Sequence, residues 1–384
     1  MTLLTIIALG VLTHTTFVSA RMVGSLYALA NGASTFTVGV LMALFALVPM
    51  LTAVRAGRWL DAVGPLRPLA AGSALLIAGS VMPVLFPYAV ADIAPLLVAA
   101  SLIGTGSMLI QQTTIHLVGE RADPNRRAAD FSWLALGASV ASLAGPVTSG
   151  LLIDYGGHRL AFAAITLLAL GSGALLYAHR RHLPSRHAAT RSAEPRPMFD
   201  LLSVKDVRHV LVAVVLISMS WDLQTFMMPV HGTAVGLSAS EIGLVLGSFA
   251  VATFVIRLAM PTLSRRFREW QVLTFTLFMS ALAFALMPWF GSFAPLAGCA
   301  FLLGLGLGAA QPNVMSLLHE RTPAGRVGEA LGLRTTLMNS SHVLLPLVFG
   351  AAGSVLGARV VFLLMASVLL AAGLGARRVS RTVR

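Results

Sequence analysis

The chain has 384 residues, of which 57% are hydrophobic and only 11% charged, and its formal net charge is +13. Soluble domains are about half apolar and about a quarter charged, so this composition, with a mean hydropathy of +0.85, excludes a water-soluble protein. An outer-membrane barrel is excluded as well, because barrel strands alternate apolar and polar residues, whereas the apolar runs here are continuous. The sequence therefore predicts an all-α polytopic membrane protein.

Apolar runs bounded by glycine, proline or charge predict twelve transmembrane helices, each near the roughly 20 residues that a bilayer core requires. The first chain segment has neither a basic leader nor a small-residue cleavage site, so we expect a retained helix there rather than a signal peptide. The predicted N-terminal half, residues 1–178, has spans at 3–28, 36–56, 67–87, 93–118, 129–152 and 160–178. The predicted C-terminal half, residues 208–384, has spans at 208–230, 238–258, 270–289, 293–318, 327–350 and 358–376.

Between the halves lies a polar segment, residues 179–207, rich in Arg, His, Ser and Pro. This composition predicts a linker that ends in a short interfacial helix at Met198–Val207. Its histidines are interpreted as part of a solvated basic linker rather than as a metal-binding tract.

Basic residues are concentrated in alternate loops, such as those holding Arg55, Arg121 and Arg265, and in the linker. By the positive-inside rule these loops, the linker and both termini are expected to be cytoplasmic. The net charge is then explained by topology, and no nucleic-acid partner is expected. Every lysine or arginine in the chain is an arginine except Lys205, and the chain is also rich in alanine. This composition favours a bacterial source and hence a bacterial cytoplasmic (inner) membrane.

The second half repeats the first. Residues 101–165 and 301–365 share thirteen identities at a constant offset of 200 residues, about twice what composition alone would give. Earlier in each half the offset is 204 residues. Two six-helix halves of the same hand predict a pseudo-two-fold bundle, with a site between the halves that opens alternately to either side. The matched residues include Gly32 and Gly236, Gly39 and Gly243, Gly104 and Gly304, Gly106 and Gly306, Gln111 and Gln311, Glu120-Arg121 and Glu320-Arg321, Arg126 and Arg326, Pro146 and Pro346, Gly150 and Gly350, Gly157 and Gly357, Arg159 and Arg359, and Phe162 and Phe362.

The loop after the second span contains a motif in which Gly57, Asp61 and Gly64 are spaced between Arg58 and Arg67. It resembles the signature Gly-x-Leu-x-Asp-x-x-Gly-x-x-basic of the major facilitator superfamily of secondary transporters, with tryptophan in place of the usual apolar residue. The resemblance covers essentially the whole chain. It implies that Asp61 and the neighbouring arginines latch the two halves on the cytoplasmic side. The matching loop of the second half lacks the aspartate, so the predicted latch is asymmetric.

The fifth span contains Gly145, Pro146 and Gly150, and this stretch is similar to the Gly-Pro motif of exporters in the superfamily. Glycine permits a close approach of a neighbouring helix, and proline removes a backbone hydrogen bond and bends the helix. The match is partial, because Ala141 and Ser149 stand where the motif prefers glycine. The fourth span lacks the arginine and glutamine of proton-coupled drug exporters, so their coupling route is not carried over to this chain.

Polar side chains within the spans are expected to face the central pathway, because facing lipid is costly. Asp222 is the only carboxylate well inside a predicted span, and we interpret it and Arg21 as the charged centre, with Asp222 as a proton site. The alternatives are a structural ion pair for Asp222 and an interfacial position for Arg21. His14 lies on the same helical stripe as Arg21. The remaining candidates, for which interhelical hydrogen bonding is the alternative, are Gln111, Gln224, Gln311 and Asn339.

No metal, cofactor or ATP site is predicted. The intramembrane histidines His14, His116 and His342 have no ligand spacing, Cys299 is the only cysteine, and there is no phosphate-binding loop sequence. No nucleophile–base–acid spacing predicts an enzyme. An ion gradient is therefore the expected energy source.

The sequence thus predicts a secondary transporter, expected to be monomeric, that exports a small organic solute by proton-coupled alternating access. Its expected partners are the solute, protons or another ion, and membrane lipid. The alternative is proton-coupled uptake of an organic anion, motivated by Arg21 and by the missing arginine of the fourth span. A channel or membrane receptor is the alternative from another class, and the duplicated halves with a latch-like loop argue against it.

Overall fold

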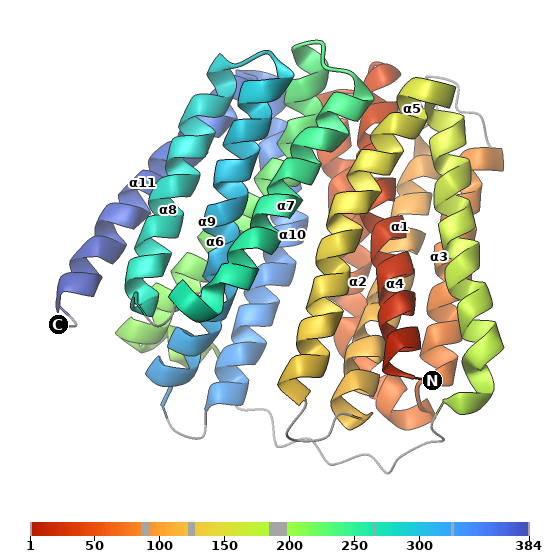
Figure 1. The fold of residues 1–384 in the computed structure, drawn as a ribbon, viewed down its shortest axis with the longest axis horizontal. Helices are drawn as coiled ribbons and strands as arrows, with labels where there is room; N and C mark the ends of the chain where they lie inside the picture. Colours follow the sequence, from red (N-terminus) through yellow and green to blue (C-terminus); the bar gives the residue numbers. More distant parts are fainter. Residues whose placement is uncertain are drawn as a thin grey trace. The chain divides into compact units, whose positions relative to one another are not determined.

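The computed structural model describes residues 2–85, 93–121, 127–183, 198–263, 266–323 and 326–382. Throughout these ranges the regular structure is helical, as the composition predicts (Figure 1). The helices that precede the predicted linker are α1 (Leu3–Ala30), α2 (Thr35–Val63), α3 (Leu66–Leu85), α4 (Ala94–Arg121), α5 (Arg127–His179) and the 3-10 turn η1 (Arg180–His182). Those that follow are η2 (Met198–Ser203), α6 (Lys205–Ala234), α7 (Ala239–Leu263), α8 (Glu269–Leu286), η3 (Met287–Trp289), α9 (Phe293–Arg321), α10 (Val327–Leu356) and α11 (Ala358–Thr382).

Eleven helices within the described ranges are long and apolar enough to cross a membrane, whereas the sequence predicts twelve spans. The difference lies in α5, whose 53 residues correspond to about 80 Å of helix, more than twice the thickness of a bilayer core. Gly157, inside α5, has the non-helical angles φ 75° and ψ 174°. The fifth and sixth predicted spans are therefore both present, separated by a break at Gly157.

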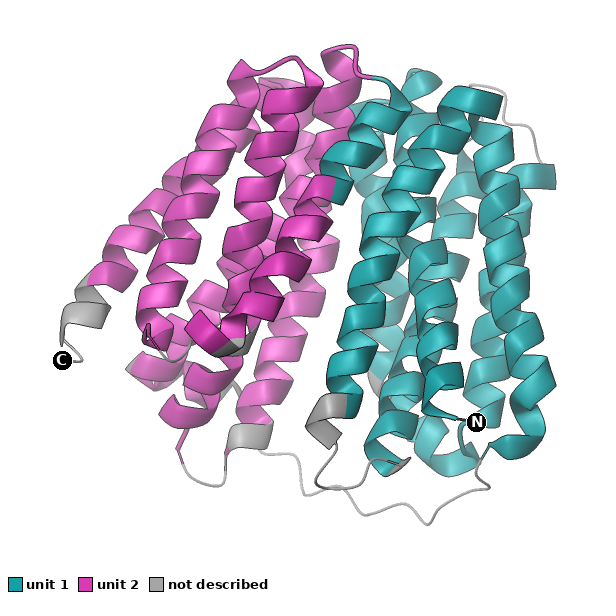
Figure 2. Ribbon diagram, in the orientation of Figure 1, with its two compact units in different colours: residues 1–191, 238–247 teal, residues 192–237, 248–384 magenta. Residues whose placement is uncertain are grey.

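The chain forms two compact units (Figure 2). Unit 1 comprises residues 1–191 and 238–247, and unit 2 comprises residues 192–237 and 248–384. Within unit 1, α1 packs along α5 and α3 packs on α4; within unit 2, α8 packs on α9 and α11, and α6 packs on α10. The predicted linker falls partly outside the described residues. Its described end forms η2, where the sequence predicts a short interfacial helix.

The repeat recurs in the packing inside each unit. A β-carbon on Gly104 of α4 would collide with the carbonyl oxygen of Phe45 in α2. A β-carbon on Gly304 of α9 would collide in the same way with the carbonyl oxygen of Phe249 in α7. The glycines are 200 residues apart and the phenylalanines 204, which are the two offsets found in the sequence. The contact of α2 with α4 and the contact of α7 with α9 are therefore made through the same kind of glycine-to-carbonyl approach.

Backbone conformation repeats as well. Gly32 and Gly236, which are repeat partners, have φ angles of 78° and 83°. Gly157 and Gly357, also repeat partners, have φ angles of 75° and 79°. Only glycine adopts this left-handed region at little cost, so the four positions form equivalent turns.

Candidate functional site

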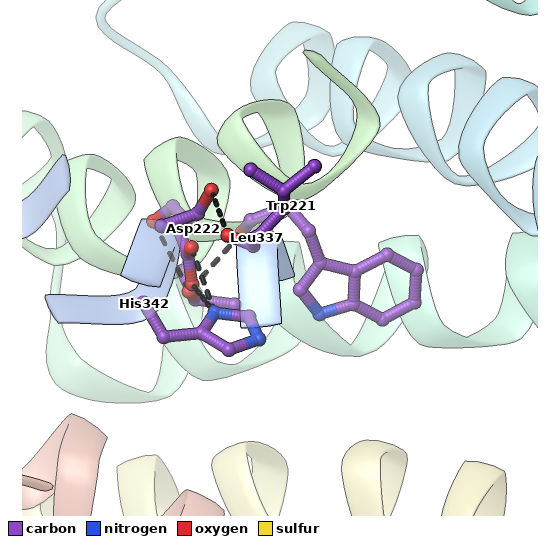
Figure 3. A network of polar contacts seen from close by, with 6 residues as sticks. Trp221, Asp222, Leu337 and His342 are labelled. Atoms are coloured by element: carbon purple, nitrogen blue, oxygen red, sulfur yellow. Dashed lines mark hydrogen bonds and ion pairs between the residues drawn. The ribbon is translucent and has the colours of Figure 1, made fainter. Parts of the chain in front are cut away.

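A carboxylate–imidazole pair lies inside unit 2. Asp222 is in the middle of α6 and His342 is in the middle of α10 (Figure 3). The Nδ1 atom of His342 is 2.9 Å from Oδ1 and 2.8 Å from Oδ2 of Asp222. An ionised carboxylate can only accept hydrogen bonds, so the Nδ1–H tautomer of His342 is the one that donates to an ionised Asp222.

The two members of the pair differ in exposure. The Asp222 side chain is 1% exposed, whereas the His342 side chain is 35% exposed. A charge in an apolar span is costly unless it is paired, and the imidazole supplies the partner. The imidazole is therefore the accessible member of the pair and the carboxylate the enclosed one.

Hydroxyl groups beside the pair hydrogen-bond to the backbone of their own helices. Thr225 donates its hydroxyl hydrogen to the carbonyl oxygens of Trp221 and Asp222, at 3.1 and 3.2 Å, and on α10 the Ser341 hydroxyl donates to the carbonyl oxygen of Leu337 at 2.9 Å (Figure 3). The indole ring of Trp221 lies edge-on against the buried Phe249 ring, with centroids 4.8 Å apart. Unit 2 thus places a carboxylate, an imidazole and an indole close together.

Sequence analysis predicts Asp222 as a site residue but assigns no role to His342. The two residues are 120 positions apart, and only the packing of α6 on α10 brings them together. In the sequence, His342 is distinguished only as a polar residue within the eleventh predicted span. The predicted site residue Asn339 lies in the same span and is half-buried.

Unit 1 contains an equivalent polar contact between α1 and α5. The Nε2 atom of His14 is 3.1 Å from the hydroxyl of Ser142, the repeat partner of His342. The His14 and Phe17 rings are stacked 6.3 Å apart, and the guanidinium of Arg21 lies 5.7 Å from the centroid of the Phe17 ring. The predicted residues His14 and Arg21 are therefore close together on α1, with an aromatic ring between them.

The predicted glutamines lie in different surroundings. Gln111 in α4 and its repeat partner Gln311 in α9 are both exposed. Gln224 in α6 is fully buried, and neither atom of its amide has a hydrogen-bond partner within the described part of the chain. Gln111 and Gln311 are thus accessible to a solute or to lipid, whereas Gln224 is enclosed.

The predicted latch motif is helical rather than a loop. Helix α2 continues to Val63, so Gly57, Arg58 and Asp61 lie in its last two turns, and the helix ends at Gly64 with φ 78°. No proline interrupts the sequence between Gly57 and Gly64, and Leu60 is buried on the inner face of these turns. The side chains of Arg58, Asp61 and Arg67 are exposed. The latch residues thus stand on a helix end and on the start of α3.

The Gly-Pro stretch of α5 makes two close approaches within unit 1. A β-carbon on Gly145 would lie 2.5 Å from Cγ2 of Val18 in α1 and 3.0 Å from the Ser19 hydroxyl. A β-carbon on Gly150 would lie 2.8 Å from the Cα atom of Ser240, at the start of α7. Pro146 lies inside the helix between these contacts. The close packing expected at the glycines is present, while the role of this stretch in gating stays a prediction.

Candidate metal ligands do not converge anywhere in the part of the chain that the structure describes, where no group of three or more His, Cys, Asp or Glu side chains is found.

A family model described as Major Facilitator Superfamily matches residues 5–220 and 210–383. A probable vesicular acetylcholine transporter-A from Danio rerio is 29% identical over 168 residues, which cover 43% of this chain and 31% of that protein. The chain therefore matches about a third of the length of this curated relative.

Solved structures with a similar fold include transporters. A nucleoside transporter, NupG, in a mutant form, aligns with a TM-score of 0.80 at 12% identity, covering 98% of this chain and 99% of that one. A peptide transporter, POT, in complex with sulfate aligns with a TM-score of 0.79 at 15% identity, covering 99% and 94%. At these identities the likeness shows the fold alone.

Proposed function

The chain belongs to the major facilitator superfamily and is a multi-pass secondary transporter; on this premise we propose that it is proton-coupled, with the Asp222–His342 pair as the coupling site. The pair is the observation that carries the proposal. Among the described residues it joins a fully buried carboxylate to a half-buried imidazole inside two predicted spans. Such a pair holds one shared proton when the site is closed and can take up a second when water reaches it.

The chemistry of the pair explains how a proton enters and leaves. Imidazole accepts a proton at one ring nitrogen and releases another from the opposite nitrogen. His342 is the exposed member, so it receives a proton from the pathway at Nε2 and passes the Nδ1 proton to Asp222. The neutral carboxylic acid no longer requires a charged or strongly polar partner, so α6 and α10 are held together less tightly in this state.

Export is the direction that we propose, with a small organic solute as cargo. The partial Gly-Pro motif at Gly145 and Pro146 supports export. The name of the curated relative contains acetylcholine, an organic cation, and a carboxylate in the pathway favours a neutral or cationic solute over an anion. Organic cations are therefore the first compounds to test.

Uptake of an organic anion is the second candidate. It is favoured by Arg21, whose guanidinium lies in the middle part of α1 beside Phe17 and His14. An arginine at this place can bind a carboxylate through two parallel hydrogen bonds. The same transport assay distinguishes the two candidates by the charge of the accepted solute and by the side on which it accumulates.

The coupling proposal is tested with Asp222→Asn in proteoliposomes under an imposed pH gradient. We expect this variant to lose accumulation of solute against its gradient and to retain exchange of internal for external solute, because exchange requires no net proton movement. The matched control is Asp206→Asn, the same substitution in the first turn of the same helix, where the side chain is 57% exposed. Accumulation at the parental level by Asp222→Asn would remove this residue from coupling, and solute flow without counterflow would indicate a channel.

A further inference from the structure

One helix is divided between the two units. The start of α7, up to Gly247, belongs to unit 1, and the remainder of α7 from Ser248 belongs to unit 2 (Figure 2). No other helix in the described ranges crosses this division. What holds the start of α7 within unit 1 therefore bears directly on how the units move.

The first backbone N–H groups of α7 have partners from two sources. Ser238 and Glu241 form a local capping box: the Ser238 N–H donates to Oε2 of Glu241 at 2.8 Å, and the Glu241 N–H donates to the Ser238 hydroxyl at 3.2 Å. The two N–H groups between them donate to Asp154 of α5: Ala239 to Oδ1 at 3.1 Å and Ser240 to Oδ2 at 2.8 Å. Asp154 thus accepts the two hydrogen bonds that the local cap leaves unmade.

Glycines let the backbones of α5 and α7 meet at this place. A β-carbon on Gly150 of α5 would lie 2.8 Å from the Cα atom of Ser240, and one on Gly243 of α7 would collide with the carbonyl oxygen of Pro146. A β-carbon on Gly247 would lie 2.7 Å from Cγ2 of Val147. The contact therefore combines close backbone packing with apolar side chains such as Met22 and Val147, and Asp154 adds two backbone hydrogen bonds at its end.

We propose that Asp154 is a positioning residue that fastens the start of α7 to α5, and that transport requires this contact to open and re-form in each cycle. We call the contact of Asp154 with the N–H groups of Ala239 and Ser240 the α7 clasp. The inference rests on the proposed alternating-access cycle, because α7 belongs to both units and cannot follow both when they rearrange.

Two features suit the clasp to repeated opening. Asp154 is exposed, so water can replace it at the two N–H groups when they separate, and opening leaves no buried polar group unpaired. The second half has no equivalent: Ser354, the repeat partner of Asp154, donates its hydroxyl hydrogen to the carbonyl oxygen of Ala351 in its own helix. Within the described residues the repeat therefore supplies one clasp and no second copy of it, so one substitution removes it.

The first test measures conformation without transport. Spin labels are placed at two exposed positions, Phe36 in α2 and Val355 in α10, in a Cys299→Ser background that removes the only native cysteine. We expect Asp154→Ala to increase the population of one of the label-to-label distances at least threefold. Asp154→Asn, which keeps one acceptor oxygen, should change the distance distribution less. The control is Glu241→Gln, which removes a negative charge from the same helix end but keeps an acceptor for Ser238. A distribution unchanged by both Asp154 variants would overturn the proposal.

The second test locks the clasp. In the same background, Asp154→Cys and Ser240→Cys are joined by a short bifunctional methanethiosulfonate, which a reductant removes. We expect the uncross-linked variant, which lacks the Asp154 acceptor, to transport more slowly than the parent, cross-linking to lower its transport at least tenfold further, and reduction to reverse that further loss. Unchanged transport by fully cross-linked protein would overturn the proposal. The label distances need no coupling ion, so a failure of the proton-coupling proposal at Asp222 is distinguishable from a failure of the clasp.

Discussion

At the scale of single residues, the proposed coupling residue Asp222 also affects the stability of the protein. Its side chain is buried, as are those of Leu223 and Phe226 in the same helix, and the imidazole of His342 contacts both of its carboxylate oxygens. Removing one member of a buried pair leaves an uncompensated polar group, whereas removing both charges does not. A variant that leaves the buried carboxylate without its imidazole should therefore be less stable than one that also removes the carboxylate charge.

We predict that His342→Ala lowers the free energy of unfolding by about 3 kcal/mol, the lower end for broken buried ion pairs because the imidazole is partly exposed. Asp222→Asn should cost less, because a neutral amide replaces the charge. The double variant should be more stable than His342→Ala alone. Thermal unfolding of the four proteins in the same detergent measures this, and strictly additive losses would show that the two residues do not interact.

At the scale of helices, α5 carries much of the close packing of unit 1. Its Gly145 faces α1 with no room for a β-carbon, whereas Gly171, in the same helix beyond the break at Gly157, has nothing within 4 Å of where its β-carbon would be. The same residue type thus stands at a tight contact and at an open position of one helix.

We predict that Gly145→Leu reduces transport at least tenfold and destabilises the protein by about 1–3 kcal/mol, the usual cost of overpacking. The variant should still insert into the membrane, because leucine raises the hydropathy of the span. Gly171→Leu is the matched control and should transport at the parental rate. Transport rates per inserted molecule measure the effect, and parental transport by Gly145→Leu would mean that the contact with Val18 yields without consequence.

The sequence predicts the helices and the repeat well because both depend on the kind of residue at each position: apolar runs for the helices and matched glycines for the repeat. Glycine is favoured where a backbone has positive φ or closely approaches another backbone, so the constant offset pairs Gly104 with Gly304. Partners across helices leave no such trace. His342 lies 120 residues from Asp222, and Asp154 lies 86 from Ser240, and only tertiary packing selects these contacts from many polar residues.

At the scale of the whole molecule, the latch motif is predicted to control the cycle rather than solute binding. Asp61 is exposed in the last turn of α2, near Arg58 and Arg67 in the sequence, and it belongs to unit 1, whereas the Asp222–His342 pair belongs to unit 2. A carboxylate at a helix end among guanidinium groups can exchange partners between two packings at little cost in stability.

We predict that Asp61→Asn slows turnover at least fivefold, leaves equilibrium solute binding within about threefold, and changes stability by less than about 0.5 kcal/mol, as expected for an exposed residue. Counterflow rate and equilibrium binding, measured with the same solute, separate the two effects. Asp206→Asn again serves as an exposed control on another helix. A large loss of binding in well-folded Asp61→Asn would contradict the prediction.

The single-residue breaks at Gly157 and Gly357 decide where the chain can be lengthened. The last two predicted spans of each half follow one another with hardly a connecting segment, since helix resumes directly on both sides of either glycine. A peptide epitope inserted at these points finds no connecting loop to extend, so it must unwind the helical turn beside it. The four residues 31–34 between α1 and α2 do form a connecting loop that an insertion can extend. Reporter tags and binding epitopes therefore belong after α1, and the breaks at the two glycines should tolerate none.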